Sequence, residues 1–376
     1  MATGFPTKAN WAAGDILTAA VLDDLAGTVN LLSNASAATG SQLVSNAAGT
    51  SFAYQLTPSA SNPVLNSAMQ IWQRGTTSAD SIGSPYTADR WQLSRSTTLG
   101  ATVSRQPTGD TTNLPNIQYC SRVQRTAANA SISVIYFSQS FESINSIPLA
   151  GKTVTLSFYA RAGANFSSAS NVLSGYLETG TGTDQNIVVV AWTGAATPIT
   201  FNSTLTTTWQ RFTYTGTLAA TATQIGLVFD YTPVGTAGAN DYFEITGVQI
   251  DVGSVALPFR TTGTSYQQEL ALCQRYYVQW NSYYSAVMCR QLSTTQSYAD
   301  CFLPVSMRTS PTLTIGTATG ATFYSGAAST ATVTIAANGT AANGFGLSFT
   351  TAAIGAVGYA GDLNIGTATI GVSAEL

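Results

Sequence analysis

The chain has 376 residues, enough for two or three domains, and only 8% of them are charged, with 14 Lys and Arg against 17 Asp and Glu. A formal net charge of −3 and the lack of a basic cluster argue against a nucleic-acid partner, because phosphate binding requires arginine and lysine in number. The sequence contains no histidine, which excludes Ser-His-Asp and Cys-His catalytic sites and histidine zinc sites.

Residues 25–73 and 309–361 contain no Asp, Glu, Lys or Arg, while 44% of the chain is hydrophobic. This composition favours packed β structure over a disordered linker, and so little surface charge favours burial in an oligomer. No apolar run reaches the length of a membrane span and no signal segment is evident. We therefore expect that the protein does not insert into a membrane and that it is made in a cytoplasm. The four cysteines, at positions 120, 273, 289 and 301, lack metal-ligand spacing and are expected to be buried free thiols.

Residues 1–62 are interpreted as an attachment helix and linker. Asp15 is a candidate helix cap, and Trp11 lies ahead of it as a candidate anchor. Apolar residues then recur at spacings of 3, 4 and 3, at Leu22, Leu25, Val29 and Leu32. The helix could pack on its own domain, or it could trimerise or insert into a larger assembly. The linker contains one short strand-like run at 52–56.

Residues 63–262 are expected to form an antiparallel β-sandwich. Strands are predicted at 131–137, 154–159, 187–192, 211–214, 225–229 and 242–252. In the last strand the apolar phase slips by one residue at Gly247, which predicts a β-bulge. A connecting helix is predicted over 263–282, where Ser265 and Gln268 can form a capping box. Its apolar residues would be Tyr266, Leu270, Cys273, Tyr277 and Trp280.

Residues 283–376 return to short strands joined by many glycine turns, and we interpret them as a C-terminal β tip. The strands are predicted at 297–303, 312–315, 321–324, 331–335, 345–350 and 363–372. Neighbouring subunits are expected to cover the edges of such strands.

Several stretches resemble a known family. Four runs resemble bacteriophage tail-fibre and receptor-binding proteins. They are NPVLNSAMQIWQRGTT from residue 62, YTADRW from residue 86, ITGVQIDVGSVALPFR from residue 245 and SYQQELALCQRYY from residue 265. GKTVTLSFYARAG, WQRFTYTGTL and DYFEITGVQIDVG are similar, in this order, to carbohydrate-binding jelly rolls. The resemblance implies a virion adhesin with a lectin-like module, docked on other tail or baseplate proteins through its N-terminus.

Glycan binding requires aromatic faces and polar groups for sugar hydroxyls. The candidates for this role lie in the tip, at Tyr283, Tyr284, Tyr298, Tyr324, Phe345 and Tyr359. Trp72 and Trp91 are expected to pack in the core, and Arg74, Asp89 and Arg90 to form a structural ion pair.

Glycoside hydrolysis needs two carboxylates at a fixed separation. Its candidates are Glu142, Glu178, Asp184, Asp230, Asp241, Glu244 and Asp251, and nothing in the sequence brings two of them together. Glu244 is expected to face solvent, and with Asp241 it is a weak candidate for calcium. We therefore predict no catalytic residue, no metal site and no cofactor.

The sequence thus predicts a mainly β homotrimer, with an N-terminal helix, a sandwich, a connecting helix and a tip. It would reside in the virion and bind host surface polysaccharide or lipopolysaccharide without catalysis. A capsule depolymerase, a purely structural fibre segment and a cellular adhesin are the alternatives. The adhesin would require a secretion signal or a wall anchor.

Overall fold

The computed structural model describes residues 41–45, 52–56, 62–78, 80, 83–281, 286–316, 322–325, 328–330, 333–351, 360–365 and 369–376. Residues 1–60 and 61–376 form two compact units. In the first unit β1 (Ser41–Ser45) and β2 (Phe52–Leu56) pair antiparallel, so the strand predicted at 52–56 is confirmed. The predicted attachment residues, Trp11, Leu22, Leu25, Val29 and Leu32, lie outside the described residues.

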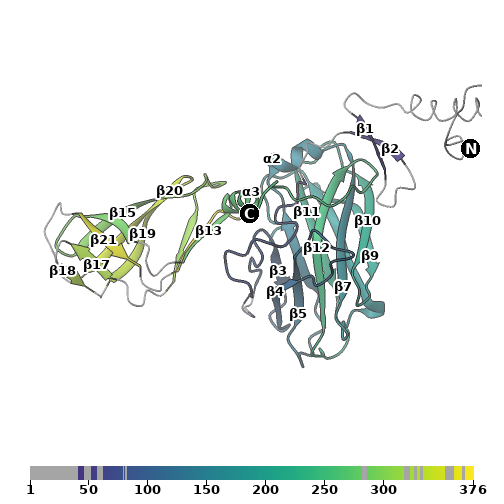
Figure 1. The fold of residues 1–376 in the computed structure, drawn as a ribbon, viewed down its shortest axis with the longest axis horizontal. Coiled ribbons are helices and arrows are strands. Elements are labelled where there is room, and N and C mark those ends of the chain that lie inside the picture. The colour runs from purple at the N-terminus through teal and green to yellow at the C-terminus, as the bar shows by residue number, and fades with distance from the viewer. Residues whose placement is uncertain are drawn as a thin grey trace, which may run out of the picture. The chain divides into compact units, whose positions relative to one another are not determined.

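Two five-stranded antiparallel sheets pack face to face in the second unit, and the predicted β-sandwich is confirmed (Figure 1). The first sheet, in the order β10-β7-β12-β5-β4, consists of β4 (Ala101–Pro107), β5 (Tyr119–Arg125), β7 (Thr153–Ala162), β10 (Gln210–Thr217) and β12 (Tyr242–Val252). The second sheet, in the order β3-β6-β11-β8-β9, consists of β3 (Gln92–Arg95), β6 (Ile135–Ser140), β8 (Val172–Gly180), β9 (Ala196–Thr204) and β11 (Gln224–Tyr231). Three short helical turns, α2 (Ser143–Ser146), η1 (Ile147–Leu149) and η2 (Ala169–Asn171), lie between strands.

Aromatic side chains from both sheets fill the space between them. Phe158 of β7 meets Phe229 of β11 edge to face, with ring centroids 4.9 Å apart. Trp91 stacks on Phe137 at 5.0 Å and is fully buried, as the sequence predicted. Trp72 is also buried, at 8% exposure. The alternation along the strands therefore positions the core, because every second side chain points between the sheets.

The bulge predicted in β12 is present. The register of β12 against β7 shifts between Thr246 and Gln249, and Gly247 between them has φ +60°. A Cβ at Gly247 would lie 2.8 Å from side-chain atoms of both Ile117 and Tyr159. Glycine is therefore required here twice over, for its left-handed backbone and for the lack of space.

The connecting helix α3 (Tyr266–Gln274) is shorter than predicted. Ser265 caps it by accepting a hydrogen bond from the Gln268 amide, but the Gln268 side chain accepts from Thr264 instead of returning to Ser265. The continuation of the helix to 282 was wrong, because residues from Tyr277 onward form β13 (Tyr277–Asn281) and pair with β22 (Thr369–Ser373). The pairing partner lies some 90 residues away in sequence, so local periodicity could not indicate it.

Residues 187–192 are not the strand that the sequence predicted. They form turns that pack on the outside of the second sheet, where a Cβ at Gly226 would lie 2.5 Å from Ile187 and 2.9 Å from Trp192. The prediction was wrong because the apolar side chains of this run cover a sheet instead of joining one. The strands β3, β4, β5, β8 and β9 were not predicted.

The C-terminal strands form two further sheets. A three-stranded sheet has the order β13-β22-β16, with β16 at Thr312–Ile315 as predicted. A seven-stranded sheet, in the order β18-β17-β21-β14-β15-β20-β19, consists of β14 (Ala286–Gln291), β15 (Gln296–Phe302), β17 (Thr322–Ser325), β18 (Ala328–Thr330), β19 (Val333–Ala341), β20 (Gly344–Thr351) and β21 (Ala360–Asn364). The predicted strand at 363–372 is in fact two, β21 and β22.

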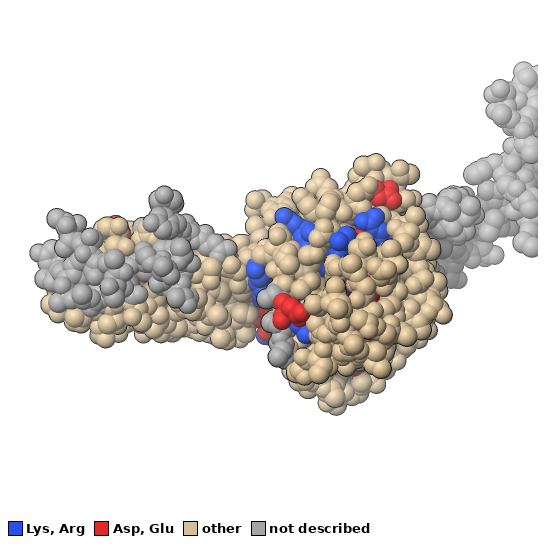
Figure 2. All heavy atoms as spheres, turned by 90° about the horizontal axis from the view of Figure 1, so that it is seen from below, with Lys and Arg blue, Asp and Glu red and all other residues tan. Residues whose placement is uncertain are grey.

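The four cysteines are free and buried, as predicted. None of the helices in the described ranges is long and apolar enough to cross a membrane. Figure 2 shows one face of the molecule, on which the charged side chains are few and most of the described surface is uncharged.

Candidate functional site

Five of the seven carboxylates that the sequence singled out are engaged by arginines inside the fold. The ion pairs are Glu142–Arg275, Asp184–Arg308, Asp241–Arg125, Asp251–Arg260 and Glu244 with both Arg122 and Arg161. These groups hold strands and loops together and are not available to a substrate. The remaining two, Glu178 and Asp230, have no hydrogen-bond donor or cation in the described part of the chain.

The prediction that Glu244 faces solvent was wrong. Glu244 is fully buried, because Arg122 and Arg161 lie directly across from it on the two neighbouring strands and neutralise it there. Asp241 is equally buried and accepts hydrogen bonds from Arg125 and Ser167. Both carboxylates are therefore occupied, and within the described residues no cluster of acidic, cysteine or histidine side chains could hold a metal ion.

Glu178 and Asp230 lie on the outer face of the second sheet, with two tyrosines beside them. On β11, Asp230 pairs with Tyr136 of β6 on one side and with Ser174 of β8 on the other. Tyr176 and Glu178 follow Ser174 at alternate positions of β8 and so project from the same face. We call these five residues, Tyr136, Ser174, Tyr176, Glu178 and Asp230, the tyrosine face.

The intervening residues establish that the tyrosine face points away from the core. Phe137 on β6, Phe229 on β11 and Leu177 on β8 belong to the hydrophobic core between the sheets. Since successive side chains of a strand alternate in direction, their neighbours point outward. Val228 and Ser138 lie on this outer side at 0% and 1% exposure, so surrounding side chains cover them. The Ser138 hydroxyl has no partner among the described residues.

Burial alters the acid–base properties of this face. Desolvation raises the pKa of both Glu178 and Asp230, and no cation in the described ranges opposes it. Desolvation, followed by the charges of Glu178, Tyr136 and Asp230, raises the pKa of Tyr176 to about 12, so this hydroxyl keeps its proton at neutral pH. Partly buried carboxylates without partners destabilise a fold, which makes them candidates for a ligand site.

The backbone positions of Glu178 and Asp230 lie farther apart than the carboxyl groups of a glycosidase pair. Asp230 lies opposite Ser174, and Glu178 is four residues farther along β8. At about 3.3 Å per residue and about 4.8 Å between strands, their Cα atoms are roughly 14 Å apart. Retaining and inverting glycosidases hold their carboxyl groups at about 5 to 9.5 Å. The tyrosine face can accept hydrogen bonds from sugar hydroxyls and offer aromatic surface, which suits binding without cleavage.

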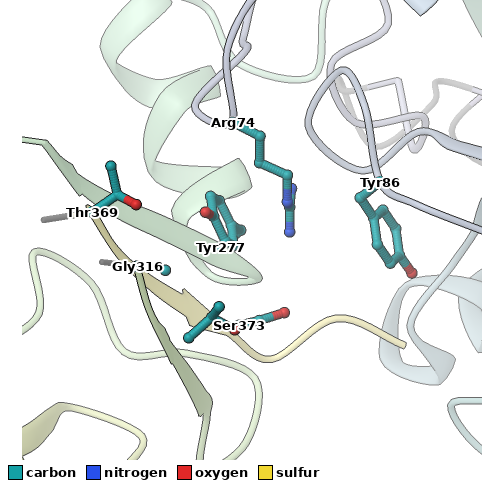
Figure 3. Close-up of a pocket in the computed structure, with 8 residues that line it drawn as sticks. Arg74, Tyr86, Tyr277, Gly316, Thr369 and Ser373 are labelled. Atoms are coloured by element: carbon teal, nitrogen blue, oxygen red, sulfur yellow. The ribbon is translucent and has the colours of Figure 1, made fainter. Parts of the chain in front are cut away.

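A separate pocket of about 330 Å³ lies elsewhere in the second unit (Figure 3). Its lining residues come from the N-terminal loops of the sandwich and from the three-stranded sheet, and are Arg74, Tyr86, Tyr277, Thr314, Gly316, Thr369, Gly371 and Ser373. Of the ligand candidates that the structure describes, which are Tyr298, Tyr324 and Phe345, none lines this pocket.

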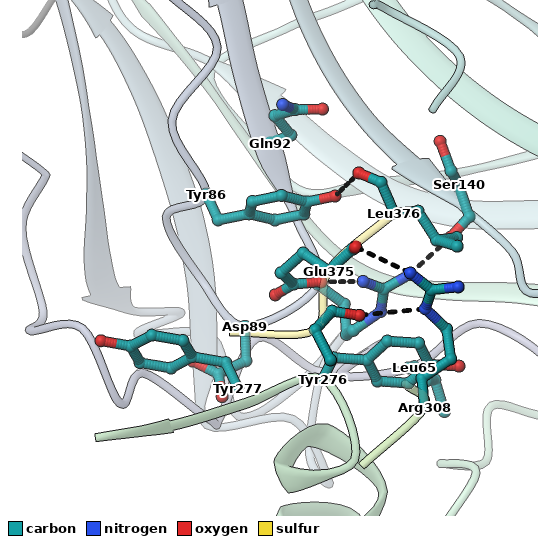
Figure 4. Close-up of polar contacts among 12 residues, drawn as sticks. Leu65, Tyr86, Asp89, Gln92, Ser140, Tyr276, Tyr277, Arg308, Glu375 and Leu376 are labelled. Carbon is teal, nitrogen blue, oxygen red and sulfur yellow. Dashed lines mark hydrogen bonds and ion pairs between the residues drawn. The ribbon is translucent and has the colours of Figure 1, made fainter. Parts of the chain in front are cut away.

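Arg74 and Arg90 do form a structural ion cluster, but their partner is Glu375 and not Asp89 as predicted. Figure 4 shows Glu375 with Tyr276, Arg308 and Leu376 around it. The prediction failed because Glu375 is some 285 residues away in sequence, and because Asp89 turns to the amide groups of Gln73 instead. Arg90 also stacks on Tyr276 at 3.7 Å and donates to the Ser140 carbonyl.

The contacts of Glu375 and its neighbours extend this ion cluster. Arg308 donates hydrogen bonds to the backbone carbonyls of Ala374 and Glu375, each at 3.0 Å, and pairs with Asp184. The Tyr86 hydroxyl and the Asn186 amide both donate to the Leu376 carbonyl. Burial, then the charge of Glu375, raises the pKa of Tyr86 to about 12. These groups are occupied with one another and serve structure.

The structure does not bring the tip aromatics together into a described site. Phe345 is buried at 4% exposure and packs edge to face against Trp280, so it belongs to the core of the tip. Tyr324 is 46% exposed, and Tyr298 is half-buried. Tyr283, Tyr284 and Tyr359 lie outside the described residues. Phe345 thus contributes to the core of the tip, because a small β domain needs aromatic side chains for its own packing, and the ligand role of the tip aromatics stays a prediction.

Sequence reasoning missed Tyr136 and Tyr176 as site residues. One signal was present: in the run VLSGYLETG, Leu173 and Leu177 alternate with Ser174, Tyr176 and Glu178. What the sequence could not show is that β11 lies between β6 and β8 and brings Tyr136 to the same face.

No family model matches this chain, and no curated protein matches it. Among solved structures, a CBM4 structure is 18% identical and covers 44% of this chain and 88% of its own, with a TM-score of 0.28. The xylan-binding CBM22-2 domain of Xyn10C from Paenibacillus barcinonensis is 16% identical over 44% of this chain and 92% of its own, with a TM-score of 0.27. A cyclase from Fischerella sp. TAU, in complex with 4-(1H-indol-3-yl)butan-2-one, is 11% identical over 52% of this chain and 99% of its own, with a TM-score of 0.34. Scores of this size establish neither a family nor a ligand, and the function depends on this chain's own residues.

Proposed function

We propose that this protein is a non-catalytic attachment protein of a virion, which binds host surface polysaccharide or lipopolysaccharide through the tyrosine face of its sandwich. The observation that carries the proposal is a pair of carboxylates, Glu178 and Asp230, which have no partner among the described residues and lie beside Tyr136 and Tyr176 on the outer face of a sheet. Carboxylates accept hydrogen bonds from sugar hydroxyls, and tyrosine rings stack on sugar rings.

The virion role rests on the sequence runs around residues 62–91 and 245–277, which resemble those of phage tail fibres. Attachment by a fibre suits weak sites, because several copies displayed together raise the overall avidity without new contacts. We expect a homotrimer, docked on tail or baseplate proteins through residues 1–62.

Binding can be tested by isothermal titration of the full chain with purified host polysaccharide and lipopolysaccharide. Tyr136→Ala with Tyr176→Ala is expected to weaken binding at least tenfold, since it removes both aromatic faces and a loss of about 1.4 kcal/mol is already tenfold in affinity. Tyr266→Ala removes a tyrosine that is 54% exposed on α3 and serves as the matched control, with no change expected. Equal losses in both proteins would contradict the assignment of the tyrosine face.

A depolymerase is the second candidate function, because Glu178 and Asp230 both have raised pKa values, as general acids do. It predicts release of reducing ends from the same polysaccharide, and that release should stop in Glu178→Gln or Asp230→Asn. Our proposal expects no release from the unmodified protein. Sustained release that requires either carboxylate would overturn the non-catalytic role.

A further inference from the structure

The pocket of about 330 Å³ in Figure 3 is distinct from the tyrosine face and has a polar wall that the fold leaves unused. Along β22, Thr369, Gly371 and Ser373 alternate with Ile370 and Val372, whose side chains are fully buried in the core of the tip. The alternation turns the two hydroxyls and the glycine toward the pocket.

A third hydroxyl completes this wall. Thr314 of β16 lies directly across from Gly371 of β22, and it also lines the pocket. Within the described residues, the side chains of Thr314, Thr369 and Ser373 make no hydrogen bond. Each hydroxyl can both donate and accept, so the wall offers three two-way hydrogen-bonding groups around one glycine.

The absence of side chains at two lining positions keeps the pocket open. A Cβ at Gly371 would lie 2.9 Å from the Tyr277 hydroxyl, and a Cβ at Gly316 would lie 2.8 Å from the Thr369 hydroxyl. Larger residues at either position would therefore intrude on the hydroxyl wall.

Arg74 forms the opposite wall and is held rigidly. Its guanidinium lies 3.4 Å above the Tyr277 ring, and its Nη2 donates to Glu375 at 3.1 Å. The Tyr277 ring is thereby covered on one side. Arg74 shares Glu375 with Arg90, and its Nη1 makes no hydrogen bond among the described residues, so it can donate to a ligand oxygen. An anionic ligand would have to compete with Glu375 for Arg74, so the pocket favours an uncharged ligand.

We propose that this pocket binds a single neutral pyranose unit, which the hydroxyls of Thr314, Thr369 and Ser373 would recognise. A volume of about 330 Å³ is near the lower end of the roughly 300–1,000 Å³ typical of small-molecule sites, which fits one sugar ring and not an extended chain. The proposal goes beyond the tyrosine face, because the two sites share no residue and require different groups.

The test is ligand-observed NMR titration of the full chain with methyl glycosides of glucose, galactose, mannose and N-acetylglucosamine, and with glucuronate and inorganic sulfate. At least one neutral glycoside should bind, at about millimolar affinity or tighter. Thr314→Val with Thr369→Val removes two hydroxyls while preserving shape, and should weaken that binding at least tenfold. Thr312→Val, two residues along β16 and outside the pocket lining, is the matched control and should change it less than twofold.

Filling the pocket provides an independent variant. Gly371→Val should also abolish binding. The thermal unfolding midpoint of this variant, compared with that of the unmodified protein, checks that the variant is folded. Binding of no neutral glycoside, tighter binding of glucuronate or sulfate, or unchanged affinity in the Thr314→Val, Thr369→Val protein would each overturn the proposal. Tyr136→Ala with Tyr176→Ala should leave monosaccharide binding intact, so failure of the tyrosine face and failure of the pocket are separable.

Discussion

At the scale of single residues, the fold separates its carboxylates into two kinds. Asp241 is buried against Arg125 alone, and removing Arg125 would leave its charge without compensation, while Glu244 is buried against both Arg122 and Arg161. Asp230 is half-buried with no partner in the described part of the chain, and its pKa is raised by burial. A residue that destabilises its own fold is expected to be retained for binding.

We predict that Asp230→Asn weakens glycan binding while leaving the fold as stable or more stable at neutral pH. Because the folded-state pKa of Asp230 is raised, the folded protein holds its proton to higher pH, so the unfolding free energy falls as pH rises through that pKa. The gain should be at most about 1 kcal/mol, since solvent screens a half-buried group. Urea unfolding of both proteins at neutral pH and below pH 4 measures this. The gain should shrink at the lower pH, and a loss of stability at neutral pH would show that Asp230 has a structural role.

Arg125 illustrates the other kind. It is fully buried, and it donates to Asp241 at 2.7 Å and to the carbonyls of Asn129 and Ser131. We predict that Arg125→Met destabilises the protein by about 3–5 kcal/mol, because Asp241 would be left charged and buried. Arg105→Met, which removes a half-buried arginine of the neighbouring strand β4, should cost less than about 1 kcal/mol in the same urea titration. Similar losses in both would show that Arg125 is not specially placed.

At the scale of elements, the sequence predicted best where pattern and pairing agree. The bounds of β12 and β16 matched because apolar alternation runs through each strand, and Gly247 marked the bulge. The prediction failed where distant partners decide. Tyr277 continues a helical spacing, yet it pairs with Ser373 in a sheet. Residues 187–192 have the apolar composition of a strand, yet they form turns that cover the outer side of the second sheet. The tyrosine face could not be predicted, because strand order is absent from local sequence.

The bulge itself can be tested by substitution. We predict that Gly247→Ala destabilises the protein by about 2–4 kcal/mol, through both a φ of +60° and contacts of 2.8 Å with Ile117 and Tyr159. Gly235→Ala has a similar φ of +72° but nothing within 4 Å, so it isolates the backbone strain and should cost about 1 kcal/mol. If thermal unfolding showed equal losses, crowding at the bulge would play no part.

At the scale of the whole molecule, the chain combines few charged residues with the tyrosine face, a candidate binding surface on the sandwich. Such a protein is suited to repeated display, in which weak sites act together. We predict that the full chain is a trimer, so light scattering after size-exclusion chromatography should give three times the chain mass of 39.1 kDa. A mass of 39.1 kDa at micromolar concentration would contradict the trimer but not the tyrosine face.

The most direct test of glycan attachment is titration of host polysaccharide with the unmodified protein and with the Tyr136→Ala, Tyr176→Ala protein, while reducing ends are assayed in the same samples. We predict saturable binding by the unmodified protein, at least a tenfold loss in the variant and no release of reducing ends from either. Unchanged binding in the variant, or steady release of reducing ends by the unmodified protein, would contradict the account.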